Sequence, residues 1–216
     1  MKLFMMMTAL IIGLATTAQA QVGKGLFAGG SLGFTMGGTN YQNGSNTTKG
    51  PTSSSFNVTP RIGYYFTDNI AAGIQFGFAG TSGKINGIVV TTTSSNTLSV
   101  GLFGRYALPL GDEGKFAFTG DLNLGFSATN GKSETGSLSV KSDPISQISV
   151  GIAPGILFFP TPKIGLEAGL GNILALTATT ETEANNNDNK IKSTQIQIFN
   201  ISTLGFYFGL NYYFNR

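Results

Sequence analysis

Residues 56–78 read FNVTPRIGYYFTDNIAAGIQFGF, and this stretch decides the fold. Apolar side chains hold most even positions from Phe56 to Phe66 and from Ile70 to Phe78, whereas Asn, Thr, Arg, Gln and Gly hold most odd positions. Alternation with a period of two over this length predicts β-strands with one apolar face. Because the turn formers at residues 67–69 separate the two runs, the stretch predicts an antiparallel hairpin.

The same phase of alternation extends along the chain in both directions. Similar runs begin at six further places, which brings the number of predicted strands to eight: Leu26, Leu98, Phe116, Ile148, Ile164 and Ile196. Short connections at residues 67–69, 109–114 and 160–163 alternate with long ones at residues 38–53, 81–93, 130–143 and 181–192. The long connections are rich in Ser, Thr, Asn and Gly, which predicts mobile, solvated loops. This plan predicts an all-β fold: an eight-stranded antiparallel up-and-down transmembrane β-barrel.

The distribution of charge indicates which face of the strands is outside. Only 11% of the residues are charged, whereas a soluble domain has roughly 25%. The even strand positions hold no Lys, Arg, Asp or Glu, and the odd positions hold only four charges: Arg61, Arg105, Asp121 and Glu167. A soluble ligand-binding barrel would expose the odd face, which is too poor in charge for a surface in water. A lipid-facing even face fits, because a charge at the bilayer midplane costs about 2–4 kcal/mol.

The N-terminus has the layout of a secretory signal peptide. Lys2 precedes an apolar run from Leu3 to Leu14, and residues 18–20 read AQA. The run is shorter than the about 20 residues that a membrane anchor needs. We therefore expect residues 1–20 to be cleaved and residues 21–216 to form the barrel domain.

Aromatic residues gather at the strand ends next to the short connections. They predict a girdle at one membrane interface made of Phe27, Tyr64, Tyr65, Phe66, Tyr106, Phe116, Phe118, Phe158, Phe159, Tyr212, Tyr213 and Phe214.

Two segments resemble a known family. Both resemble parts of the small eight-stranded outer-membrane barrels of the OmpX and OmpA type. Residues 63–71 (GYYFTDNIA) look like the first periplasmic turn of that family, and the alternation over residues 204–214 looks like its C-terminal strand. The resemblance covers residues 25–214 and implies the outer membrane of a Gram-negative bacterium. It also implies that the barrel-assembly machinery reads the last strand through Phe206, Phe208, Leu210, Tyr212 and Phe214. Asn215 and Arg216 follow that strand, whereas many members of the family end on the aromatic residue.

The four odd-position charges form the one constellation that suggests chemistry. Arg61, Arg105, Asp121 and Glu167 lie at similar depth in their strands, so they are able to meet across the lumen. They would form either a proton or ion path, or a plug of salt bridges that neutralises itself. Because side chains just fill an eight-stranded barrel, we favour the plug.

Composition argues against an enzyme. The chain has no histidine and no cysteine, so a hydrolase of the histidine-dependent kind would lack its base. We expect no catalytic residue, cofactor or metal. One loop holds five charged residues, which predict a solvated charge cluster or a weak cation site, with calcium the less favoured ligand: Glu181, Glu183, Asp188, Lys190 and Lys192. The net charge of +3 comes without basic tracts, which argues against nucleic acid as a partner.

These observations predict a monomeric outer-membrane barrel with a structural or surface-interaction role. Its expected partners are outer-membrane lipid and, during insertion, the assembly machinery. Two other functions stay open at this point. The many inward glycines would suit a narrow porin-like channel, and the Ser/Thr/Asn loops would suit adhesion or recognition of an external ligand.

Overall fold

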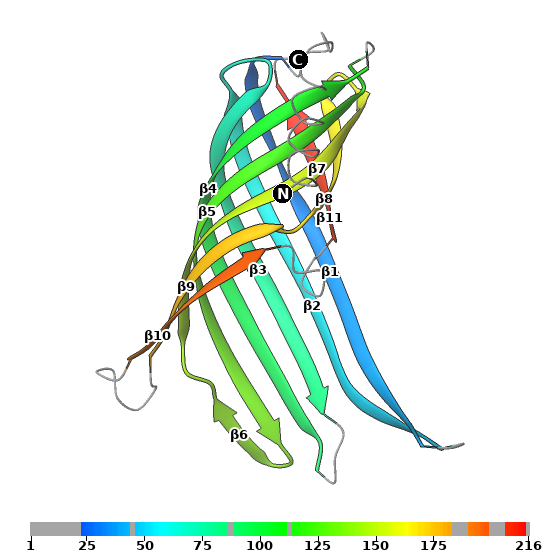
Figure 1. The fold of residues 1–216 in the computed structure, drawn as a ribbon, viewed down its shortest axis with the longest axis vertical. Coiled ribbons are helices and arrows are strands. Elements are labelled where there is room, and N and C mark those ends of the chain that lie inside the picture. Colours follow the sequence, from blue (N-terminus) through cyan, green and yellow to red (C-terminus); the bar gives the residue numbers. More distant parts are fainter. Residues whose placement is uncertain are drawn as a thin grey trace, which may run out of the picture.

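A computed structural model describes residues 23–43, 46–85, 89–111, 114–182, 190–198 and 206–214. Within these ranges the chain forms a closed antiparallel barrel of eight strands (Figure 1), and this confirms the predicted fold class. The predicted signal peptide at residues 1–20 lies outside the described residues. In the part of the chain that the structure describes, no helix has the length and apolarity of a membrane span.

Six strands each form one position in the barrel wall: β1 (Gly25–Asn43), β2 (Asn46–Tyr65), β3 (Ile70–Ile85), β4 (Thr91–Leu110), β5 (Phe116–Thr135) and β7 (Ile145–Thr161). The seventh position consists of β8 (Ile164–Leu170) and β9 (Leu174–Thr182), which are separated by a break at residues 171–173. The eighth consists of β10 (Lys190–Ile198), which pairs with β9, and β11 (Phe206–Tyr213), which pairs with β8. Short strand β6 (Leu138–Lys141) pairs with the end of β5.

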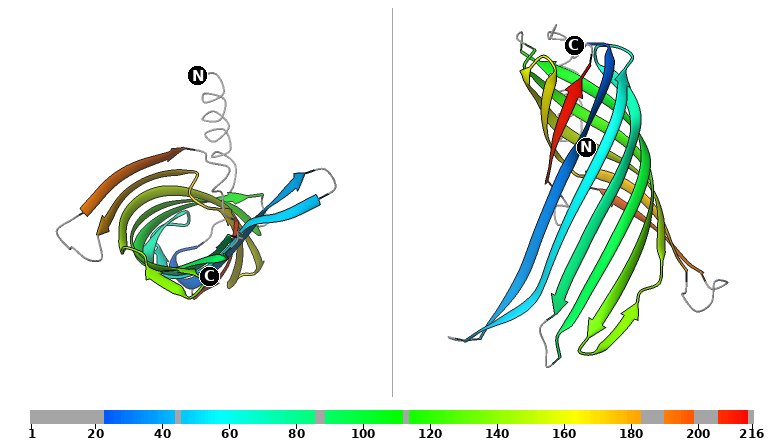
Figure 2. Two further views of the ribbon diagram at one scale, coloured as in Figure 1. Left: turned by 90° about the horizontal axis from the view of Figure 1, so that it is seen from below. Right: turned by 180° about the vertical axis from the view of Figure 1, so that it is seen from behind.

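Pairing between β1 and β11 closes the barrel. It runs from Phe27 opposite Tyr213 to Gly33 opposite Tyr207. Figure 2 shows the resulting ring in the view along the barrel, with the β1–β2 and β9–β10 hairpins extending away from it. The short connections and the C-terminus lie at one end of the barrel, and the long hairpins lie at the other (Figure 1).

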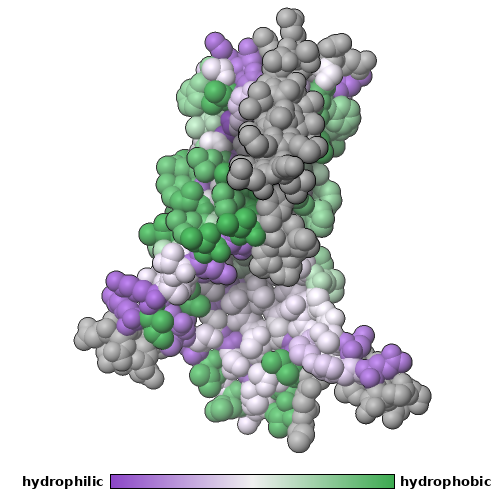
Figure 3. Space-filling model, viewed as in Figure 1, coloured by the Kyte–Doolittle hydropathy of each residue, from purple (hydrophilic) through white to green (hydrophobic). Residues whose placement is uncertain are grey.

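Even-numbered side chains of the wall point outward and odd-numbered ones point into the barrel. Leu102, for example, is 55% exposed, whereas its neighbour Phe103 is 3% exposed. Exposed Leu, Ile, Val and Phe cover the middle of the wall, and polar colours dominate toward the long hairpins, apart from a small hydrophobic area at their ends (Figure 3). Such a surface is costly in water and favourable in lipid.

The strands continue far into the segments that we predicted as long loops. Pairing of β1 with β2 reaches Asn43 opposite Asn46, and pairing of β4 with β5 reaches Thr91 opposite Thr135. Residues 38–53, 81–93 and 130–143 therefore form hydrogen-bonded hairpins over much of their length, and the prediction of mobile loops was wrong there. Thr is a good strand residue, and Thr hydroxyls also pair across strands, as at Thr97 and Thr129 (2.7 Å).

The aromatic girdle is smaller than predicted. Phe27, Tyr65, Phe159 and Tyr213 are buried inside the barrel, so placing them at the lipid interface was wrong. All four occupy odd positions. Successive side chains of a strand point to opposite faces regardless of residue type, so these four point into the barrel. The remaining members face outward, with Phe158 half-buried: Tyr64, Phe66, Tyr106, Phe116, Phe118, Phe158, Tyr212 and Phe214.

Candidate functional site in the barrel lumen

The four predicted luminal charges come from four different strands and meet inside the barrel. Arg61 lies on β2, Arg105 on β4, Asp121 on β5 and Glu167 on β8. Arg105 and Asp121 stand directly opposite each other on neighbouring strands, whereas Glu167 reaches the arginines from the other side of the ring. We call these four residues the charge cluster.

Arg105 is the centre of the charge cluster. Its Nε and Nη2 donate to the two carboxylate oxygens of Asp121 at 2.7 and 2.5 Å. Its Nη1 and Nη2 donate to the two oxygens of Glu167, both at 2.8 Å. One planar guanidinium therefore binds two carboxylates in bidentate fashion, which is the strongest geometry for such a pair.

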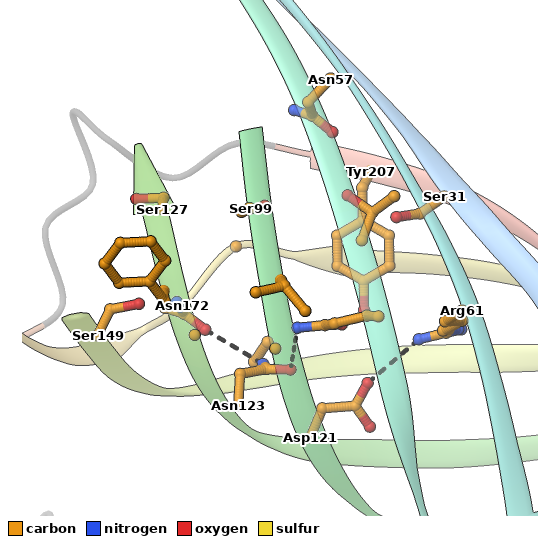
Figure 4. Close-up of a pocket in the computed structure, with 18 of the residues that line it drawn as sticks. Ser31, Asn57, Arg61, Ser99, Asp121, Asn123, Ser127, Ser149, Asn172 and Tyr207 are labelled. Carbon is orange, nitrogen blue, oxygen red and sulfur yellow. Dashed lines mark hydrogen bonds and ion pairs between the residues drawn. The ribbon is translucent and has the colours of Figure 1, made fainter. Parts of the chain in front are cut away.

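Arg61 completes the charge cluster from β2. Its Nη1 donates to Asp121 at 3.4 Å, as Figure 4 shows, and its Nη2 donates to Glu167. Its Nε also donates to Oδ1 of Asn211 at 3.2 Å. Glu167 accepts two further hydrogen bonds, from the Tyr207 hydroxyl and from Nδ2 of Asn211, each at 3.0 Å.

Burial sets the energetic character of the charge cluster. The side chains of Arg105 and Glu167 are 0% exposed, and those of Arg61 and Asp121 are 6% and 5% exposed. Two guanidinium groups and two carboxylates cancel, so the cluster has no net charge. Loss of one member would leave a buried charge without its partner, which typically costs about 3–5 kcal/mol.

An aromatic layer fills the barrel next to the charge cluster, on the side of the barrel end that carries the short turns. Phe27 is its centre, with ring centroids 5.4 Å from Tyr65 and 5.5 Å from Tyr213. Phe103 joins the layer to the cluster, because its ring lies 6.1 Å from that of Phe27 and 5.8 Å from the Arg61 guanidinium carbon. Leu157 and Phe159 pack into the same layer.

A polar cavity of about 390 Å³ lies on the other side of the charge cluster. We call it the vestibule. Arg61, Asp121 and Tyr207 lie among the residues that line it, and Asn123 bridges Gln75 (3.3 Å) and Asn172 (3.4 Å) across it. Figure 4 shows these groups converging from several strands. Most of the remaining lining is small and neutral, including Ser31, Thr59, Ser99 and Ser149.

Comparison with known proteins decides the family. The outer membrane protein beta-barrel domain matches residues 6–214. The chain belongs to this family. Membership confirms the resemblance noted from residues 63–71 and 204–214, and it places the protein in the outer membrane of a Gram-negative bacterium rather than among soluble barrels.

The solved structures that match the chain include outer-membrane barrels of low sequence identity. Ail, the attachment invasion locus protein of Yersinia pestis, is 17% identical, with 88% of this chain and 99% of that chain covered and a TM-score of 0.39. Neisserial surface protein A is 13% identical, with 88% and 96% covered and a TM-score of 0.37. The N-terminal barrel of Pseudomonas aeruginosa OprF is 10% identical, with 89% and 100% covered and a TM-score of 0.38. No curated protein matches the chain.

The last strand of this outer-membrane barrel presents the predicted assembly signal to lipid. All five members face outward, with 44–69% of each residue exposed: Phe206, Phe208, Leu210, Tyr212 and Phe214. Of the predicted acidic and basic cluster at the tip of β9–β10, Glu183 and Asp188 lie outside the described residues. Within the described ranges, no group of three or more His, Cys, Asp or Glu side chains is placed to hold a metal.

Two partners of the charge cluster are not among the residues predicted from the sequence. Asn211 and Tyr207 both bind Glu167, yet we treated their strand as an assembly signal alone. Their odd positions on β11 were an available signal, because Asn211 is a polar residue on the inward face of a strand that is otherwise apolar and aromatic.

Proposed function

We propose that this outer-membrane barrel is a monomeric, non-enzymatic protein that acts at the cell surface through its long hairpins, with a lumen closed to ions. The observation that carries the surface role is an exposed apolar patch at the hairpin ends, beyond the lipid-facing wall. The outward positions of β4 change from Leu98 and Val100 in the wall to Asn96, Ser94 and Thr92 toward the tip. At about 3.3 Å per residue, the six residues from Thr91 to Asn96 span roughly 20 Å along the strand, which is about 15 Å of height past the apolar wall at a tilt of about 40°.

The exposed apolar patch, which we call the tip patch, comes from two neighbouring hairpins. Val89 lies beside the β5–β6 turn, since its Cγ1 is 3.6 Å from the position that a Cβ on Gly136 would take. The patch includes Ile85, Val89 and Val90 from the β3–β4 end and Leu138 and Val140 from β6, which are 43–65% exposed. Contiguous apolar side chains on a surface in water are typical of interaction sites.

Two layers inside the barrel support the proposed closure of the lumen. Side chains already fill most of an eight-stranded barrel, and here the charge cluster joins β2, β4, β5 and β8 across it. The aromatic layer blocks the same passage on the side of the short turns. An ion would have to break several buried hydrogen bonds to pass.

The residue types of the chain and the state of its buried carboxylates support a non-enzymatic function. The chain has neither histidine nor cysteine, and the buried carboxylates of Asp121 and Glu167 are engaged with arginines. Hydrogen bonds to guanidinium groups already occupy these carboxylate oxygens, which argues against their use as catalytic bases.

A narrow channel is the second candidate function, and the vestibule favours it. A polar cavity of about 390 Å³ extends into the barrel as far as Arg61 and Asp121. A channel would therefore need a rearrangement only in the part of the lumen that holds the charge cluster and the aromatic layer.

The surface role is tested by binding of barrel-bearing lipid vesicles to a panel of immobilised extracellular proteins. We expect the double variant Leu138→Ser and Val140→Ser, or a variant that lacks residues 39–52, to lose binding that the native barrel shows. Lys132→Ser changes an exposed polar position of the same hairpin and serves as the control. Binding that survives both hairpin changes would contradict the proposed surface role.

A further inference from the structure

An apolar groove lies on the outer face of the barrel, between β5, β7, β9 and β10. It has a volume of about 330 Å³, and its walls are the side chains of Leu122, Val150, Ile152, Leu174, Leu176 and Ile196. Gly151 and Ala175 lie in its floor. The volume is within the range of small-molecule sites, roughly 300–1,000 Å³, and every residue that lines it is apolar.

The groove results from the direction in which β9 and β10 leave the barrel. On a convex barrel wall, neighbouring outward side chains diverge and enclose nothing. Here β10 pairs with β9 along its whole length, from Lys190 to Ile198, and the hairpin extends away from the ring (Figure 2). The outer face is therefore concave at this place, and Ile196 stands beside Leu176, which in turn stands beside Val150.

The floor of the groove depends on the break between β8 and β9. A Cβ on Gly151 would lie 2.5 Å from the Asn172 side chain, so only glycine fits there without a shift. Asn172 lies in the break and points to the luminal side, where it accepts a hydrogen bond from Asn123. Gly151 is buried between this luminal side chain and the apolar depression on the outer face.

Charge at the outer end of the groove specifies the ligand further. Side chains alternate along a strand, so Lys190 and Lys192 lie on the same outward face of β10 as Ile196 and Ile198, and all four are exposed. Lys192 is four residues from Ile196, which is about 13 Å along a strand. With a strand tilt of about 40°, Lys192 lies roughly 10 Å and Lys190 roughly 15 Å further along the bilayer normal than Ile196. Half of the hydrocarbon core is about 15 Å, so these long side chains place their amines at headgroup height when Ile196 lies among acyl chains. Figure 3 shows the hydrophobic area giving way to hydrophilic colour toward the free end of this hairpin.

We propose that the groove is a binding site for one phosphate-bearing lipid of the outer leaflet, with an acyl chain between β7, β9 and β10 and the phosphate at Lys190 and Lys192. The inference concerns the wall of the barrel and does not depend on the surface role or on the state of the lumen. The proposal predicts one lipid that stays bound at a defined site, in contrast to the lipids that exchange freely around any membrane protein.

Native mass spectrometry of the detergent-solubilised protein, after incubation with bisphosphorylated lipid A, tests the groove. We expect one retained lipid on the native barrel. Val150→Phe fills the groove and should abolish retention, and Leu176→Phe is a second variant that fills it from β9. Val100→Phe places the same side chain on the outward face of β4, where Val100 is 47% exposed, and should leave retention unchanged. A heat-modified gel shift verifies that each variant is folded. Equal retention by the groove variants and the control would overturn the site.

The phosphate contact is tested by the double variant Lys190→Gln and Lys192→Gln. We expect affinity for the bisphosphorylated lipid to fall about fivefold for each lysine removed, with little change for the dephosphorylated lipid. Lys84→Gln, an exposed outward lysine on β3, is the matched control. Equal affinity of the native barrel for the two lipids would overturn the assignment of the phosphate.

Discussion

Arg105 donates to both carboxylates of the charge cluster and is fully buried. Arg105→Ala would leave Asp121 and Glu167 with Arg61 as their one cationic partner in the cluster. We expect the free energy of unfolding to fall by about 3–5 kcal/mol. Urea titration in lipid vesicles, followed by the heat-modified gel shift, measures the change.

The control for Arg105 is an exposed ion pair on the surface. Lys132 and Glu134 are 2.8 Å apart with side chains 53% and 45% exposed. Lys132→Ala should cost at most about 1 kcal/mol, because water and salt screen exposed pairs. Equal losses for Arg105→Ala and Lys132→Ala would contradict a buried charge cluster.

Gly73 gives a second prediction at the residue scale. A Cβ there would lie 2.2 Å from the Ile62 carbonyl oxygen and 2.7 Å from the Phe103 ring, whereas a Cβ on Gly104 would meet nothing within 4 Å. We expect Gly73→Ala to destabilise the barrel by about 1–3 kcal/mol and Gly104→Ala to leave it nearly unchanged. The same urea titration distinguishes them, and similar midpoints for both variants would contradict the packing described.

At the scale of the elements, the hairpins beyond the wall should be ordered. Residues 92–96 of β4 pair with residues 130–134 of β5 on one side and with residues 80–84 of β3 on the other. We expect their amides to exchange with deuterium much more slowly than the amides of the short turn at residues 67–69, because a closed ladder protects its hydrogen bonds. Mass spectrometry of the barrel in nanodiscs measures this, and equally fast exchange would indicate the solvated loops that composition suggested.

Strand phase was the part of the fold that sequence could predict. Alternation along the predicted strands identified both the lipid-facing residues and the inward direction of Arg61, Arg105, Asp121 and Glu167. The odd positions of Phe27 and Tyr213 also indicated that their side chains point inward. We assigned both to the girdle at the membrane interface because they are aromatic, and this was wrong.

Other features of the elements could not be predicted from alternation. The break at residues 171–173 turns Asn172 inward from an even position, and this depends on backbone geometry that periodicity does not encode. Long Ser/Thr segments carry no apolar face, so their pairing depends on the neighbouring strands of the closed wall and not on a local pattern. Bonds from Asn211 and Tyr207 to Glu167 join residues that are 44 and 40 positions apart in the chain.

At the scale of the whole molecule, the scarce charge of the chain is partitioned by location. Lipid-facing positions of the wall hold none, the lumen holds a neutral cluster of four, and the described lysines at outward strand positions lie beyond the wall, as Lys84, Lys132 and Lys192 do. This arrangement supports the proposed closed lumen, because the vestibule ends at the charge cluster and the aromatic layer lies behind it.

Conductance in planar lipid bilayers tests the closed lumen most directly. We expect the native barrel to insert without stable single-channel currents at potentials up to the rupture limit of the bilayer. The quadruple variant Arg61→Ser, Arg105→Ser, Asp121→Ser and Glu167→Ser is measured in parallel and gives the current of the same barrel without the charge cluster. Discrete, long-lived current steps from the native protein would contradict the closed lumen and would support the channel instead.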